Sequence, residues 1–94
     1  MRTINYTPQF KRDYRKLKGG TYRQIIDKEL NTVFVILRND LPLPQKYLDH
    51  PLKGRWRGHR ECHIRPNLLL IYRKPNDQLL ELTRIGSHSE LSLV

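Results

Sequence analysis

The N-terminal part of the chain shows a short strand pattern followed by a helical one. Residues 2–6 are typical of a short edge strand, and in Thr7-Pro8 the threonine can cap a helix whose first position the proline can occupy. Apolar residues then recur at the i, i+4, i+7 spacing of one helix face, and Gly19-Gly20 predicts the end of this helix. The apolar stripe consists of Phe10, Tyr14 and Leu17.

A second helix is predicted from residue 21 to about residue 38. Thr21 and Gln24 have the spacing of a capping box, in which side chains satisfy the first free backbone N–H groups of a helix. The β-branched residues crowded into 33–36 favour a strand instead, but the longer helical pattern outweighs a four-residue propensity. That pattern is carried by Tyr22, Ile26, Leu30, Val33 and Leu37.

Prolines and a glycine interrupt regular patterns between residues 39 and 56, so we expect an ordered loop there, of a length that usually has a function. Three strand patterns follow, at residues 59–65, 68–74 and 78–85. Pro66-Asn67 predicts a tight turn between the first two strands, and Pro75-Asn76-Asp77 makes the last two a hairpin.

The order of these elements predicts a single α+β domain over residues 1–94. The middle strand of the three, with the run Leu-Leu-Leu-Ile-Tyr, is apolar on both faces, so it should lie centrally and be covered by helices on at least one side. We therefore expect a short N-terminal strand and two helices packed on one face of a sheet that contains an antiparallel meander. The other face would remain available for function.

The strongly basic composition indicates which kinds of molecule the protein can bind. The chain has 94 residues, a net charge of +9 and a sequence pI of about 10.1, which favours a phosphate backbone or an acidic protein as partner. Cys62 is the only cysteine, which excludes an intrachain disulfide. Because no apolar run approaches the roughly 20 residues of a membrane span and the first residues lack a signal-peptide pattern, we expect a cytoplasmic protein with no membrane partner.

Two of the four histidines lie in or next to the strand pattern at residues 59–65. Period-two alternation places Glu61, His63 and Arg65 on one face, away from the helices, and Cys62 with Ile64 on the other. Three ionisable groups on one face favour a functional site over a solvated surface histidine. His59 is a weaker candidate, for phosphate contact or for structure.

The other two histidines lie where the backbone can direct their rings. His50 stands between Asp49, which could orient it, and Pro51, which restricts its backbone. His88 follows the last strand, where it is either presented over the sheet edge or part of a frayed tail. Arg84 is a candidate phosphate clamp, with a surface ion pair as the alternative, because a guanidinium can donate to two phosphate oxygens at once.

Aromatic and metal chemistry are the remaining candidates. Trp56, between Arg55 and Arg57, could stack on a base, although a single tryptophan in a small domain more often packs against a loop. His59 and His63 have the interval of zinc ligands, but on a strand this interval separates them by about 13 Å, too far for one ion. We therefore expect no metal and no cofactor.

An ordered series of motifs spans nearly the whole chain. The most informative are Leu41-Pro42-Leu43-Pro44, Tyr47-x-Asp49-His50-Pro51-Leu52-x-Gly54-x-Trp56-x-Gly58, Arg60, His63, Ile71-Tyr72 and Arg84-x-Gly86-x-His88. In these residues the sequence resembles the RelE/ParE toxin superfamily, and specifically its YafQ branch of bacterial toxin–antitoxin systems.

The resemblance implies an mRNA endonuclease that acts in the ribosomal A site and is silenced by a co-expressed acidic antitoxin, with operator DNA bound only through the antitoxin complex. His50, His63 and His88 fall on family histidines implicated in catalysis, and Glu61 stands where the family has an aspartate. Asn67 replaces another family aspartate, and Ser92 stands where a phenylalanine is usual. The expected RNA contacts are Arg60, Arg65, Arg84 and Trp56.

The side chains also suggest the chemistry, because RNA carries its own nucleophile, the 2′-OH. A metal-free enzyme needs a base for that proton, an acid for the departing 5′ oxygen and cations for the phosphate charge. Two other classes of function remain open for this sequence. A RelE-like module without nuclease activity could act with its antitoxin as a corepressor, since neither Asn67 as a base nor Ser92 as a stacking partner can replace the usual residue. A ParE-like gyrase inhibitor is less favoured, because that branch does not need these histidines.

Overall fold

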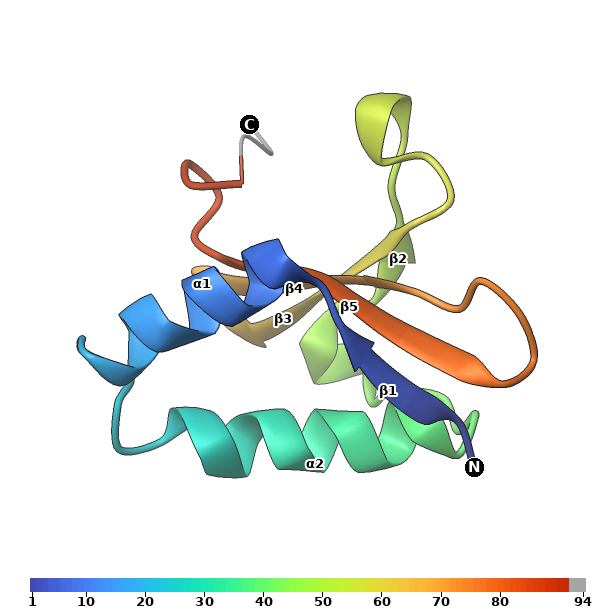
Figure 1. Ribbon diagram of the computed structural model, residues 1–94, viewed down its shortest axis with the longest axis horizontal. Coiled ribbons are helices and arrows are strands. Elements are labelled where there is room, and N and C mark those ends of the chain that lie inside the picture. Colours follow the sequence, from blue (N-terminus) through green and yellow to red (C-terminus); the bar gives the residue numbers. More distant parts are fainter. Residues whose placement is uncertain (92–94) are drawn as a thin grey trace.

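The computed structural model describes residues 1–91 and shows two helices packed on a five-stranded mixed sheet (Figure 1). The strand order is β1-β5-β4-β3-β2, in which β1 runs parallel to β5 and every other pair is antiparallel. The elements in chain order are β1 (Thr3–Tyr6), α1 (Pro8–Lys18), α2 (Ile26–Arg38), the 3-10 turn η1 (Gln45–Tyr47), β2 (His50–Pro51), the 3-10 turn η2 (Gly54–Trp56), β3 (Arg60–Arg65), β4 (Leu68–Arg73) and β5 (Leu79–Gly86). The predicted fold class is confirmed.

The first helix begins and ends as its sequence predicts. The Thr7 side chain accepts a hydrogen bond from the backbone N–H of Phe10 at 3.0 Å, and Pro8 occupies the first turn. Basic residues fill the last turn, where they complement the partial negative charge of the helix end, and Gly19 is the C-cap.

The second helix begins at Ile26, so the predicted start at Thr21 is wrong. Residues 21–25 form turns instead, and no side chain caps the helix. The chain needs these residues to reverse direction after α1, which a helix starting at residue 21 would not allow. The β-branched segment is helical because the core decides its conformation: Val33 is completely buried.

The main core lies between the helices and one face of the sheet. In β4 every second residue faces the helices and the residues between them are buried on the opposite face, so the central strand is apolar throughout. The helices contribute Phe10, Ile26, Leu30, Val33 and Leu37, and the sheet contributes Cys62, Ile64, Leu68, Leu70, Tyr72, Leu80, Leu82 and Ile85.

The opposite face of the sheet carries a second, smaller core. Leu69 and Ile71 of β4 are completely buried there together with Leu91, under partly buried Leu52 and Trp56. The face that we expected to be open is therefore partly covered, by the loop after β2 and by the segment after β5. In Figure 1 both segments rise from the sheet on the side away from α2.

The longest helix, α2, has 13 residues, and within residues 1–91 no helix has the length and apolarity needed to cross a bilayer.

Candidate active site

Glu61 and His63 of β3 lie on the face opposite the helices, as predicted, whereas Arg65 does not. In the ladder Glu61 pairs with Ile71 and His63 with Leu69, the two residues of β4 that belong to the second core. The register shifts between His63 and Arg65, which breaks the alternation. The Arg65 guanidinium donates to the Glu29 carboxylate of α2 at 2.6 Å, so Arg65 extends toward the helix side.

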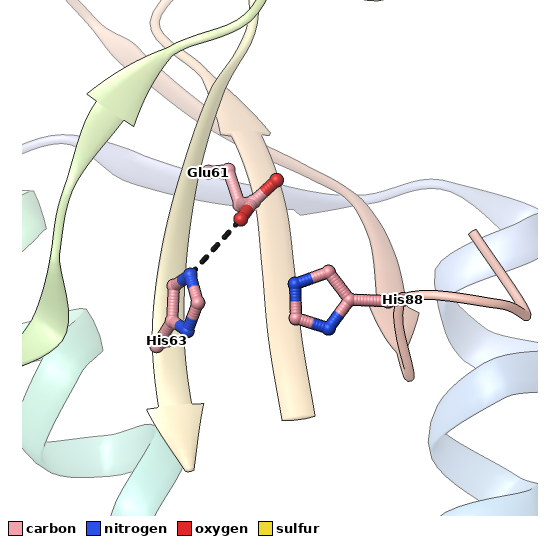
Figure 2. A group of neighbouring side chains, drawn as sticks. All are labelled: Glu61, His63 and His88. Carbon is pink, nitrogen blue, oxygen red and sulfur yellow. Dashed lines mark ion pairs between the residues drawn. The ribbon is translucent and has the colours of Figure 1, made fainter. Parts of the chain in front are cut away.

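Three histidines surround one buried carboxylate. Glu61 is only 4% exposed, and its Oε1 lies 3.1 Å from His63 Nε2 and 3.8 Å from His50 Nε2. The His63 ring centroid lies 6.4 Å from that of His50 and 5.7 Å from that of His88. Figure 2 shows the rings of His63 and His88 on neighbouring segments, both directed toward the Glu61 carboxylate. The structure thus brings together all four predicted catalytic residues.

The ring of His50 is oriented by the backbone. Its Nδ1 lies 2.7 Å from the carbonyl oxygen of Leu48, and because a carbonyl only accepts, Nδ1 carries the proton. Nε2 is then free to take up or release a proton beside Glu61. Leu48 adopts a left-handed backbone conformation with φ of 50°, which turns its carbonyl toward the ring.

Asp49 holds the loop rather than the His50 ring. Its carboxylate accepts from the Arg60 guanidinium at 3.1 Å and from the Tyr72 hydroxyl at 2.5 Å. Hydrogen bonding to Asp49 raises the pKa of Arg60, and burial, with the Asp49 hydrogen bond second, raises the pKa of Tyr72. The predicted RNA contact Arg60 is therefore engaged in fixing β3 to the residue next to His50.

His88 is fixed by Asn67 of the turn between β3 and β4. Asn67 Oδ1 lies 3.2 Å from the backbone nitrogen of His88 and 3.1 Å from its Nδ1. With the amide oxygen as acceptor, Nδ1 carries the proton and Nε2 faces Glu61 and His63. The Asn67 amide therefore orients the ring of His88.

The backbone that carries His88 is closed into a turn by Glu90. The Glu90 carboxylate accepts from the backbone N–H of Ser87 at 2.9 Å and from the Lys16 ammonium of α1 at 2.7 Å. These contacts, the Lys16 hydrogen bond first, lower the pKa of Glu90 to about 2. A methyl group added at Gly86 would lie 3.1 Å from Glu90 Oε1, so glycine allows this close approach. His88 therefore lies in a hydrogen-bonded turn and not in a frayed tail.

Two further predicted residues lie away from the carboxylate. The Arg84 guanidinium donates to Asp13 of α1 at 2.8 and 3.1 Å, and this hydrogen bond raises the pKa of Arg84. Trp56 packs against the second core and against the edge of the His59 ring, with centroids 5.5 Å apart. Packing is the role that we favoured for Trp56, and its contact with a base stays a prediction.

Glu61, His63 and His88 could also hold a metal ion. One ligand atom from each lies within 4.8 Å of the others, which suits a cation bound by two imidazoles and a carboxylate. Sequence reasoning considered only the pair His59 and His63, and His59 is not part of this group. The strand-to-turn contact between residues 63 and 88 has no sequence-local signal, so spacing rules could not find it.

The helix-covered mixed sheet thus carries a cluster of three histidines and a carboxylate on its other face. Residues 2–93 match the family model of the bacterial toxin of type II toxin–antitoxin system, YafQ. The chain belongs to the YafQ family.

Relatives in sequence and structure agree. The mRNA interferase toxin YafQ of Escherichia coli K12 is 39% identical over 90 residues, which cover 96% of this chain and 95% of the relative. The toxin chain in the crystal structure of the E. coli DinJ–YafQ complex superposes with a TM-score of 0.81 at 37% identity, covering 97% and 98% of the two chains. A metal-bound toxin from Helicobacter pylori superposes with a TM-score of 0.82 at 42% identity, covering 97% and 99%.

Proposed function

We propose that this protein is an mRNA interferase, an endoribonuclease that inhibits translation by cutting mRNA in the ribosomal A site. The observation that carries the proposal is the arrangement of His50, His63 and His88 around the buried Glu61 carboxylate. The name of the E. coli relative, mRNA interferase toxin, supports the same substrate.

The reaction uses the 2′-OH of the RNA as nucleophile. One imidazole takes the 2′-OH proton, the 2′ oxygen attacks phosphorus, and the bond from phosphorus to the 5′ oxygen breaks as a protonated imidazole gives that oxygen its proton. The products are a 2′,3′-cyclic phosphate and a 5′-OH. His50 and His88 share these two proton transfers, because each has Nδ1 held by an oxygen acceptor and Nε2 free.

His63 and Glu61 assist by charge. Glu61 lies within ion-pair distance of His63 Nε2 and of His50 Nε2, so its carboxylate stabilises a positive charge on either ring. Cationic rings beside the scissile phosphate stabilise the extra negative charge of the transition state. Arg65 and Arg84 would contact phosphate only after exchanging their present carboxylate partners for the RNA, so an Arg84 clamp is the alternative that a double-mutant cycle with Asp13 tests.

The alternative, a RelE-like corepressor without nuclease activity, rested on Asn67 and Ser92, and the structure removes the argument from Asn67. Asn67 orients His88 through its amide oxygen, and this task does not need a base. The other argument, Ser92, lies outside the described residues. We propose an acidic antitoxin as the silencing partner, supported by the net charge of +9 and by the DinJ–YafQ complex of the relative. We place the protein in the cytoplasm, with operator DNA bound through that complex.

Induced expression of the parent protein tests this function. Translation is expected to stop, and primer extension on a reporter mRNA is expected to show new 5′ ends within the reading frame, because the ribosome presents the substrate. The matched control is a reporter with a mutated start codon, which the ribosome does not translate and which should stay intact. Growth arrest with undiminished translation and an uncut reporter would contradict the proposal and favour a gyrase-type toxin.

Metal addition separates acid–base chemistry from metal chemistry. A chelator selective for transition metals, with Mg²⁺ held constant for the ribosome, is expected to leave cleavage intact. Added Zn²⁺ is expected to inhibit, because it would occupy ring nitrogens of His63 and His88 that must hold or exchange protons. Single-turnover cleavage of ribosome-bound mRNA is the measurement. Loss of activity on chelation, restored by zinc or manganese, would contradict the metal-free mechanism.

A further inference from the structure

Among residues 1–91, three cations on the turn that contains η2 have no acidic partner. Lys53, Arg55 and Arg57, which we call the basic turn, are exposed, and none forms an ion pair with an acid among residues 1–91. The arginines that sequence reasoning selected differ in this respect. Arg60, Arg65 and Arg84 are each neutralised by a carboxylate: Asp49, Glu29 and Asp13, respectively.

The basic turn has a defined shape. Gly54 and Gly58 have φ values of 66° and 88°, which favour glycine, and the Arg57 backbone N–H donates to the Gly54 carbonyl at 3.0 Å. At its base the Leu52 N–H donates to the His59 carbonyl at 3.0 Å. The three cations therefore stand on a closed turn, which lowers the conformational entropy lost when they bind a ligand.

Trp56 anchors the basic turn beside the histidine cluster. Its ring packs on Leu69, Ile71 and Leu91. Leu69 and Ile71 of β4 pair with His63 and Glu61 of β3. The Leu91 backbone N–H donates to the Ser87 carbonyl and so closes the turn that carries His88. The Arg55 guanidinium lies over the Trp56 ring, 5.3 Å from its centroid, and this contact restricts the arginine side chain. Figure 1 shows the segment rising from the sheet on the side away from α2.

The geometry points to the basic turn as a binding site for RNA phosphates, occupied by the strand that passes through the histidine cluster or by neighbouring ribosomal RNA. This inference rests on the proposed function. An RNA strand with one phosphate among the histidines continues beyond them on both sides. Unpaired cations on the same face meet the flanking phosphates without first releasing a carboxylate, which favours them over Arg60, Arg65 and Arg84.

RNA fits the basic turn better than an acidic protein does. A protein partner would be held by an apolar centre with charges around it, whereas the ring of Trp56 is turned into the second core and the exposed side chains of the turn are cationic. Phosphate contacts alone are enough for sequence-independent RNA binding, and their number is measurable, because each adds about −0.7 to the salt slope of single-strand binding.

The test is a triple substitution, Lys53→Gln with Arg55→Gln and Arg57→Gln, measured against a control with the same change in charge. The control replaces three exposed cations on the helix side that have no ion pair among residues 1–91, Lys11, Arg23 and Lys28, by glutamine. Binding is measured against salt concentration with three probes: a 2′-O-methyl RNA oligonucleotide, which cannot be cut, vacant ribosomes, and poly-L-glutamate. Thermal melts verify that both variants are folded.

For the RNA oligonucleotide, the basic-turn variant is expected to reduce the slope of log binding constant against log salt concentration by about 2 in magnitude, which is the sum for three phosphate contacts. The control variant is expected to reduce this slope by less than 1. A loss seen with vacant ribosomes alone identifies ribosomal RNA as the source of the phosphates. Three results would overturn the inference. They are equal losses of binding in both variants, no loss of binding in the basic-turn variant, and a loss of binding seen only with poly-L-glutamate. Because the oligonucleotide is not cut, this result is independent of whether the parent protein cleaves mRNA.

Discussion

Replacing His88 by alanine is expected to slow single-turnover cleavage of ribosome-bound mRNA by about 100-fold to 10,000-fold, with ribosome binding nearly unchanged. The reason is that His88 Nε2 faces Glu61 and His63 while Asn67 holds Nδ1, so the ring is placed to transfer a proton. A proton-transfer group acts mainly in the transition state, so its loss lowers the rate more than the affinity.

His59 provides a matched control for His88. It lies against the ring of Trp56 and is not among the clustered ligand atoms of Glu61, His63 and His88. His59→Gln should therefore keep the cleavage rate within a few-fold of the parent. A His88→Ala protein that also cleaves within a few-fold of the parent would remove His88 from the mechanism and leave His50 and His63 as the proton-transfer residues.

The fold could be predicted wherever one local pattern decided the structure. The Thr7-Pro8 start of α1, the apolar run of β4 and the two turns of the meander each follow from residues adjacent in sequence. The start of α2 could not, because the capping-box spacing at Thr21 competes with the chain reversal after α1. The second core was missed for a related reason: Leu91 and Trp56 meet over β4 only through tertiary contacts.

The candidate site was predicted in its residue types but not in its contacts. Alternation along β3 placed Glu61 and His63 on one face, the positions of His50 before Pro51 and of His88 after the last strand made both candidates, and the family resemblance supported all four. The register shift after His63 directed Arg65 elsewhere, and a bulge of this kind has no signal in its own sequence. The acceptors that orient the rings, the Leu48 carbonyl and Asn67, belong to a left-handed backbone and to a distant turn, which only the folded chain reveals.

Arg84 connects the last strand to α1, and its replacement by alanine is expected to destabilise the protein by about 2 kcal/mol. Both partners are largely buried, with side chains 22% and 11% exposed for Arg84 and Asp13. The Asp13 carboxylate also accepts from the backbone N–H of Ile85 at 3.1 Å and from the Gln9 side-chain amide at 3.2 Å, so without Arg84 it stays as a buried charge with only neutral partners. Urea unfolding of the parent and the variant measures this loss.

A double-mutant cycle with Asp13→Asn separates this structural role from a clamp on RNA. For a structural pair, Arg84→Ala should cost less in the Asp13→Asn background, because no buried charge is then left behind, and RNA binding by folded protein should not change. A clamp would behave differently. Removing the Asp13 charge would release the guanidinium and tighten RNA binding, and Arg84→Ala would abolish that gain. Because the carboxylate in the structure already accepts from both Nε and Nη2 of Arg84, we expect the first result.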